Sequence, residues 1–397
     1  MYFLLPIMVG CLIGILCGII PGLHPNTVAI ILSALLFSGK LSFFNPSDLL
    51  SFLIALMITN TFVDFIPSLI FSTPKDGTYL AVAPMQRYLK RGEGFLALII
   101  VTISGLIALT ILVIFSPFLG YFLKKLYPFL YTYTPDIIMV SILLFFLNSR
   151  NKKKTLLISL LASILGLEVF SLHVSSTEAL SCMLTGLFGI SSMLMGLFHK
   201  ENIPMQNIDE VNVNMKDVLK GSLFSIPGGG FSSMLPGITA TLSAIIISTF
   251  ANMNETSFIS LLGGINTANA LMCLYVLAFF GKSRNGIMKT INEMRLNVNS
   301  IKLICFSAII SGIIGAFATL NIGKFMLRNI SGLERKKIYI PALFLVFFIF
   351  LRVYGLFGIL IMISSSLLGI LCENMDVKKS TLAFSLLIPV LKTYLFM

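Results

Sequence analysis

The sequence predicts an all-helical protein that crosses a membrane many times and is built from two related halves. Of its 397 residues, 57% are hydrophobic and only 11% are charged, and the mean hydropathy is +0.97. A water-soluble domain cannot bury that much apolar surface. The same pattern of Gly and Pro also occurs twice along the chain, which predicts the two halves.

Long stretches without any Asp, Glu, Lys or Arg indicate the membrane-spanning segments. A helix needs about 20 apolar residues to cross a bilayer, and charge-free runs of that length occupy 1–39, 95–123, 179–198, 221–254, 256–281, 303–323 and 353–372. Shorter apolar runs at 137–149, 155–167, 338–351 and 380–391 predict tilted, half-spanning or buried segments. We therefore expect roughly twelve to fourteen hydrophobic segments, some of them broken.

The continuous runs predict helices rather than strands. Strands of a membrane barrel alternate apolar and polar residues over about ten positions, and these runs do not alternate. The Lys and Arg residues behind the net charge of +12 lie in short loops between the runs. They therefore indicate topology and not a nucleic acid partner.

Comparison of the chain with itself predicts repeats at 1–198 and 221–397, joined by a polar linker at 199–220. Several pairs of positions keep their order in the two halves, with a slowly drifting offset. They are Gly10 with Ser225, Gly14 with Gly229, Gly18 with Ser233, Pro21-Gly22 with Pro236-Gly237, Asn60 with Asn269, Lys75-Asp76-Gly77 with Arg284-Asn285-Gly286, and Ile103-Ser104-Gly105 with Ile310-Ser311-Gly312.

Loop charges favour an inverted arrangement of the two halves, because cytoplasmic loops collect Lys and Arg. The loop at 150–154 is strongly basic, whereas its counterpart after Arg352 carries no further basic residue, and the preceding loops show the reverse bias. This predicts a cytoplasmic face at 150–154 and an outer face at 124–136. Basic loops at both 75–91 and 282–302 do not fit the inverted arrangement.

Paired helix breaks are the strongest candidates for a binding site. Glycines four apart, at Gly10, Gly14 and Gly18, suit close helix packing, and the following Pro and Gly residues interrupt the helix. A break at membrane depth lines a cavity or packs against protein, and a half-helix N-terminus there attracts an anion. A dry packing crossover is the alternative. The candidate substrate-binding residues are Pro21, Gly22, His24, Asn26, Thr27, Asn60, Ser232, Pro236, Gly237, Thr239, Thr241 and Asn269.

Asp64 is the candidate for ion coupling. It is the one carboxylate in the apolar run 49–74. An acid inside a membrane span is costly and predicts a proton or cation carrier, so the coupling ion would be H⁺ or Na⁺. A structural Asp that is paired with another helix or lies near the interface is the alternative.

The arrangement of these motifs resembles the TctA family, the large permease of tripartite tricarboxylate transporters, and its archaeal relatives. The resemblance implies ion-coupled secondary uptake of organic anions, in bacterial systems with a small membrane subunit and an extracytoplasmic binding protein. The residues that carry it are Gly10, Gly14, Pro21-Gly22-Leu23, Thr73-Pro74, Ala83-Pro84-Met85, Lys90-Arg91-Gly92, Pro236-Gly237 and Asn266-Thr267-Ala268-Asn269-Ala270.

We therefore predict a multi-pass transporter of the cell membrane that holds an organic anion at its helix breaks. The pattern Ile20-Pro21-Gly22 with Thr27 is also similar to one in polyprenyl-phosphate translocases, so an anionic lipid headgroup is the alternative cargo. A membrane enzyme or scaffold is the alternative of another class. No catalytic residue, metal site or cofactor is predicted, because metalloprotease, serine hydrolase and Walker A patterns do not occur in the sequence. A homodimer is left open.

Overall fold

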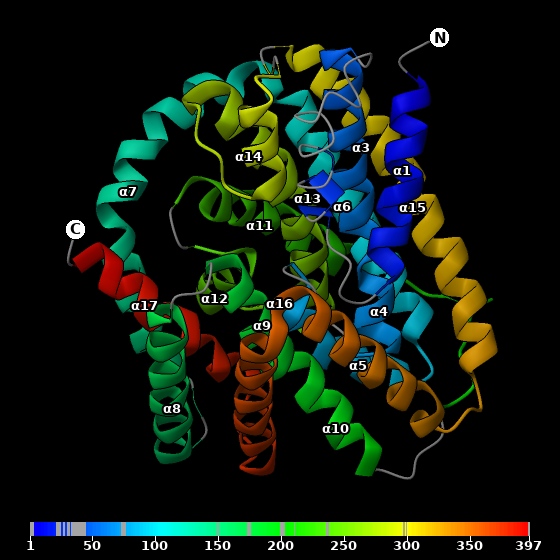
Figure 1. The fold of residues 1–397 in the computed structure, drawn as a ribbon, viewed down its shortest axis with the longest axis vertical. Coiled ribbons are helices and arrows are strands. Elements are labelled where there is room, and N and C mark those ends of the chain that lie inside the picture. Colours follow the sequence, from blue (N-terminus) through cyan, green and yellow to red (C-terminus); the bar gives the residue numbers. More distant parts are fainter. Residues whose placement is uncertain are drawn as a thin grey trace.

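A computed structural model of the chain describes residues 4–20, 25–26, 28–29, 32, 45–72, 77–147, 149, 151–172, 176–198, 203–209, 211–235, 238–296, 298 and 300–395. The regular elements over these residues are helices (Figure 1). The all-helical class predicted from the continuous apolar runs is confirmed.

The helices before residue 199 are α1 (Leu4–Ile19), α3 (Pro46–Val63), α4 (Phe65–Ile70), η1 (Tyr79–Ala81), α5 (Val82–Lys90), α6 (Gly94–Ile114), α7 (Ser116–Leu147), α8 (Lys152–Ser171), α9 (Ser176–Leu184), the π-helical turn η2 (Thr185–Ile190) and α10 (Ser191–Phe198). Those after it are α11 (Met215–Met234), α12 (Ala240–Phe250), α13 (Glu255–Phe280), α14 (Gly286–Glu293), α15 (Ile301–Ile330), α16 (Arg335–Asn374), η3 (Lys379–Ala383) and α17 (Phe384–Leu395).

Seven helical segments among the described residues are long and apolar enough to cross a membrane, or eight if the bent pair in α7 is one span. The sequence predicted more segments, because an apolar run does not reveal whether it forms a span of its own. The runs 338–351 and 353–372 lie together in α16, which bends at Gly355, and α12 is only 11 residues long. The seven segments are Pro46–Ile70, Gly94–Ile114, Lys152–Ser171, Ala179–Leu197, Glu255–Phe280, Ile301–Ile330 and Tyr339–Asn374.

Helices α3 and α13 lie at the centre of the protein. The most apolar window of the span 46–70 is 94% buried inside the protein and that of 255–280 is 89% buried, whereas that of 339–374 is only 28% buried. The outward face of α16 carries large apolar side chains such as Phe344 and Phe357, as a lipid-facing helix does. Figure 1 shows α7, α8 and α16 at the periphery of the bundle.

The spaced glycines bring helices into close contact, as predicted. A β-carbon at Gly14 would lie 2.7 Å from the Leu56 carbonyl oxygen. Gly10 lies against Ala55 and Gly18 against Val63, so α1 and α3 run in the same direction. Helices α11 and α13 are also parallel, because successive close contacts between them move towards the C-terminus of both helices.

Helices α6 and α15 run in opposite directions. Gly94 at the start of α6 lies against Leu327 near the end of α15, and further along Leu98 lies against Gly323 and Leu109 against Gly312. The helix contacts of the two halves also correspond: α1 packs on α3 as α11 packs on α13, and α6 packs on α13 as α15 packs on α3.

The break between α3 and α4 falls at Asp64 and follows from Pro67. A proline has no N–H to donate to the carbonyl four residues earlier, which here belongs to Val63. One residue further on, the Ser68 hydroxyl donates to the Asp64 carbonyl oxygen at 3.0 Å. The break exposes backbone polar groups next to the one buried carboxylate of this span.

The chain between the predicted halves is attached to both of them. The Ile203 amide donates to the Leu333 carbonyl at 3.0 Å, and the Asn207 amide donates to the Gly92 carbonyl at 2.8 Å. Helix α11 begins at Met215, so the last residues of the predicted linker, up to Lys220, are helical.

Candidate functional site

A buried polar cluster lies where α3 crosses α13. Asp64 is only 2% exposed, and the Asn266 side-chain amide donates to both of its carboxylate oxygens at 3.2 Å. The same amide donates to the Thr61 carbonyl at 2.9 Å. Because a buried carboxylate is stable only with donors around it, Asn266 holds Asp64 in place where the two predicted halves meet.

Small residues around Asn266 keep it in place. A β-carbon at Gly77 would overlap the Asn266 side-chain oxygen, so any larger residue would displace the amide from Asp64. Next to Gly77, the Thr78 hydroxyl lies 2.7 Å from the Ser68 hydroxyl. Residues 77 and 78 therefore form the wall of the Asp64 cluster.

Asn60 lies one helical turn before Asp64 and is 7% exposed. Its side-chain oxygen is buried and has no hydrogen-bond partner among the residues that the structure describes. An unsatisfied buried acceptor costs about 1–3 kcal/mol, and residues four apart share one face of a helix. The Asn60 oxygen and the Asp64 carboxylate are therefore neighbouring oxygen atoms that can coordinate a cation.

The counterpart of Asn60 in the second half, Asn269, takes part in a second polar group. The Ser232 hydroxyl lies 2.8 Å from the Asn269 side-chain oxygen, and the Cys273 sulfur lies 3.7 Å from the same oxygen.

Thr239 accepts a hydrogen bond from the Leu242 amide at 3.2 Å and caps the N-terminus of α12. Thr241 is 2% exposed.

Residues next to the two predicted breaks attach to one short segment, 284–287. The Ile287 amide donates to the Asn26 side-chain oxygen at 3.1 Å, and Gly286 lies against the Asn26 β-carbon. The Arg284 guanidinium donates to the Met234 carbonyl oxygen at the end of α11. The segment thus contacts the chain just after the first break and just before the second.

Six of the candidate residues, Pro21, Gly22, His24, Thr27, Pro236 and Gly237, lie outside the described residues. The structure brings only some of the described candidates together. Asn60 lies beside Asp64, and Ser232 lies beside Asn269, whereas Asn26 contacts α14.

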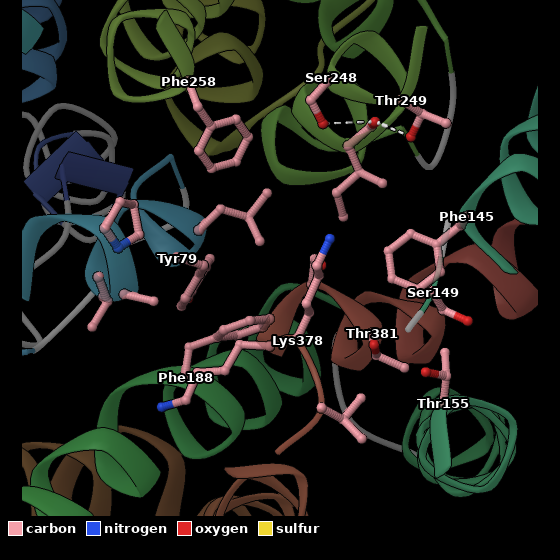
Figure 2. A pocket seen from close by; sticks show the side chains of 18 of the residues that line it. Tyr79, Phe145, Ser149, Thr155, Phe188, Ser248, Thr249, Phe258, Lys378 and Thr381 are labelled. Carbon is pink, nitrogen blue, oxygen red and sulfur yellow. Dashed lines mark hydrogen bonds between the residues drawn. The ribbon is translucent and has the colours of Figure 1, made fainter. Parts of the chain in front are cut away.

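A cavity of about 650 Å³ lies between residues of η1, α5, α7, α8, α12 and η3. Figure 2 shows Tyr79 and Phe188 on one side of it, Phe145 and Thr155 on the other, and Lys378 between them. The rings of Tyr79 and Phe188 are 6.0 Å apart. Tyr79, which lines this cavity, follows Thr78 of the Asp64 cluster directly in the chain.

The lining of this cavity carries charges of both signs, and Arg87 pairs with Glu255 and Lys379 with Glu373. Four basic and two acidic side chains line it, together with several hydroxyl groups from α8, α12 and η3. A cleft with an excess of positive charge raises the local concentration of an anionic solute. The charged residues are Arg87, Lys154, Lys378, Lys379, Glu255 and Asp376.

The sequence did not assign roles to Asn266, Gly77 and Arg284. In the sequence, Asn266 stands out only as part of the motif 266–270 that resembles the family, and Gly77 and Arg284 only as members of matched triplets in the two predicted halves. The match between the two triplets was the available indication. A glycine at the same place in both loops marks a backbone position where a side chain does not fit.

The spans, the lipid-facing helices and the buried polar groups define a multi-pass helical membrane protein with a polar interior. A family model described as "Tripartite tricarboxylate transporter TctA family" matches residues 4–383. The chain belongs to this family of transporters, which work with a small membrane subunit and a binding protein. An uncharacterized protein of Methanocaldococcus jannaschii is 26% identical over 403 residues, covering 99% of each chain. No solved structure matches.

Proposed function

We propose that the chain is a secondary transporter of the cell membrane that couples the movement of an organic anion to that of H⁺ or Na⁺. The observation that supports this most directly is the polar cluster between the two halves, where Asp64 is held by Asn266 and the Asn60 oxygen has no partner. A charged or unsatisfied group inside a span marks a substrate or ion pathway.

The coupling ion would bind between Asn60 and Asp64. Hard cations such as Na⁺ prefer carboxylate and carbonyl oxygen ligands, and both are present one helical turn apart on α3. A proton would instead bind the Asp64 carboxylate alone. The two ions differ in their dependence on Asn60, because only Na⁺ requires its oxygen.

The anion would bind at the paired helix breaks. Asn26 and Met234 flank these breaks, and both contact the segment 284–287, which supports the placement of the breaks near each other. Ser232 and Asn269 supply polar groups on the second side. The proposed substrate residues remain Pro21, Gly22, His24, Asn26, Thr27, Asn60, Ser232, Pro236, Gly237, Thr239, Thr241 and Asn269.

An inverted repeat of 1–198 and 221–397 fits this proposal. Ile103-Ser104-Gly105 in α6 and Ile310-Ser311-Gly312 in α15 are matched positions in the sequence. Equivalent helices of an inverted repeat run in opposite directions, whereas those of a parallel repeat run in the same direction. The antiparallel contacts of Gly94 with Leu327 and of Leu98 with Gly323 support the inverted arrangement.

The test is uptake of radiolabelled citrate into liposomes that contain the purified full-length chain. The family name makes a tricarboxylate the first probe, and succinate and malate complete the panel. We expect accumulation with an inward Na⁺ or H⁺ gradient and none in protein-free liposomes. Absence of uptake for every anion under either gradient, with translocation of a polyprenyl phosphate in the same liposomes, would favour the lipid alternative and reject the proposal.

A further inference from the structure

We propose that Arg284 binds the anionic group of the transported solute. The inference rests on the proposed transport function and adds a residue that the sequence motifs did not assign. The binding chemistry is that of a carboxylate or phosphate with a guanidinium, which offers up to five N–H donors in one plane.

The guanidinium of Arg284 lies inside the membrane-spanning part of the protein. Helix α11 runs parallel to α13, with Gly221 against Ser257 and Gly229 against Ala268, so the end of α11 at Met234 lies near Cys273. Cys273 precedes the last residue of α13 by about two helical turns, or roughly 10 Å at 1.5 Å per residue. Arg284 donates to the Met234 carbonyl at this level.

This cation has no carboxylate partner among the described residues. The ion pairs of the described chain do not include Arg284. Its Nε atom is buried without a hydrogen-bond partner. Arg284 lies in the connection between α13 and α14 and is partly exposed, but a buried donor without an acceptor is costly. The unpaired charge and the buried donor together indicate a site for an anion.

A purely structural role explains only part of this geometry. A basic side chain near a helix C-terminus stabilises the last carbonyls, and the contact with Met234 is of this kind. Capping α11 uses one Nη atom, whereas Nε stays buried and unsatisfied. A carboxylate that accepted from Nε would satisfy the donor and neutralise the charge.

The polar groups of the second half lie beside this position. Cys273 contacts the side-chain oxygen of Asn269 at 3.7 Å, and the Ser232 hydroxyl lies 2.8 Å from that oxygen. With its oxygen engaged, Asn269 directs its NH₂ group elsewhere, and it is partly exposed. An anion held by Arg284 could therefore also accept a hydrogen bond from Asn269.

The test is direct binding of citrate and of inorganic phosphate to the purified full-length protein, measured by titration calorimetry. Arg284→Gln should raise the Kd for the bound anion about 10- to 150-fold, the effect of removing a charged hydrogen-bond donor. Arg284→Lys should raise it less, because the charge stays and the planar fork is lost. Lys289→Gln is the control, since this side chain on α14 is 73% exposed and pairs with Glu293.

Folding is monitored by elution and thermal unfolding in detergent, because Arg284→Gln also removes the contact with Met234. If Arg284→Gln does not fold, the affinity of the Arg284→Lys variant tests the assignment. A folded Arg284→Lys variant that binds the anion with wild-type affinity would overturn it. Equal affinity of a folded Arg284→Gln variant would also overturn it.

The same proteins separate the inference from the proposed function. Anion binding that depends on Arg284, without uptake by the wild type, would reject the transport proposal and keep the binding site. Normal uptake by Arg284→Gln would reject the site alone. If the wild type binds neither citrate nor phosphate but binds vesicles with polyprenyl phosphate through Arg284, the anion is a lipid headgroup. If the wild type binds none of these probes, the inference is overturned.

Discussion

Substitution of Gly229 by Ala tests the close approach of α11 and α13. A β-carbon at Gly229 would lie 2.5 Å from the Ala268 β-carbon, 2.8 Å from the Ala268 carbonyl carbon and 2.9 Å from the Asn269 amide nitrogen. Two of these atoms belong to the backbone, so the helices must separate. The neighbouring Gly230 has no described atom within 4 Å of the equivalent position, which makes Gly230→Ala a matched control.

The magnitude follows from the comparison of the two variants. Both replace a glycine inside α11 by alanine, which favours a helix by roughly 1 kcal/mol at each position. Only Gly229→Ala adds the cost of overpacking, about 1–3 kcal/mol for an extra methyl group in a tightly packed core. The helix term cancels in the difference. We expect Gly229→Ala to be less stable than Gly230→Ala by about 1–3 kcal/mol.

Reversible unfolding of both purified proteins in mixed micelles with increasing SDS measures this difference. The ordering of the two midpoints is the decisive readout. Equal stability of the variants, or a more stable Gly229→Ala, would show that the helices are not in contact at this level. The assigned position of Asn269 relative to α11 would then be wrong as well.

Three further predictions concern the polar groups. Asp64→Asn should abolish the dependence of citrate uptake on the ion gradient and leave citrate binding intact. Asp48→Asn, in the first turn of α3, is the control and should change neither. Gradient-driven uptake by the Asp64→Asn protein would show that Asp64 has a structural role only. Thr239→Val removes the acceptor for the Leu242 amide and should lower the free energy of unfolding by about 1 kcal/mol, and an unchanged SDS midpoint would contradict it. Lys378→Gln should raise the KM for citrate more than it lowers the maximal rate, with a smaller effect at high salt; a salt-independent loss would argue against an electrostatic role.

The polar centre could be predicted because charges and amides are rare in apolar runs. Asp64 was identified as the one acid in its run, and Asn60 through its match with Asn269. Their partner Asn266 could not be assigned, since the contact depends on how α3 crosses α13. The position of the Arg284 side chain could not be predicted from the sequence either. Its side chain lies at the depth of Cys273 only because α11 ends well before α13, and a sequence of hydrophobic runs does not reveal such a difference in length.

The number of spans was predicted less well for a related physical reason. Apolar residues report burial in lipid or protein but not the continuity of a helix. Gly355 carries a positive φ of 66° and bends α16 without ending the apolar pattern. The break at Asp64, in contrast, follows from a local rule that the sequence does contain, the missing N–H of Pro67.

The attachment of residues 203–207 determines which parts of the protein can move relative to one another. The Gln206 side-chain oxygen accepts from the Gly94 amide at 2.9 Å, and the Ile203 carbonyl accepts from the Gly332 amide at 2.8 Å. This segment therefore connects the first residue of α6 to the end of α15 by hydrogen bonds. These hydrogen bonds hold one pair of ends of the two long helices together. Any movement that separates α6 from α15 at this end must first break them.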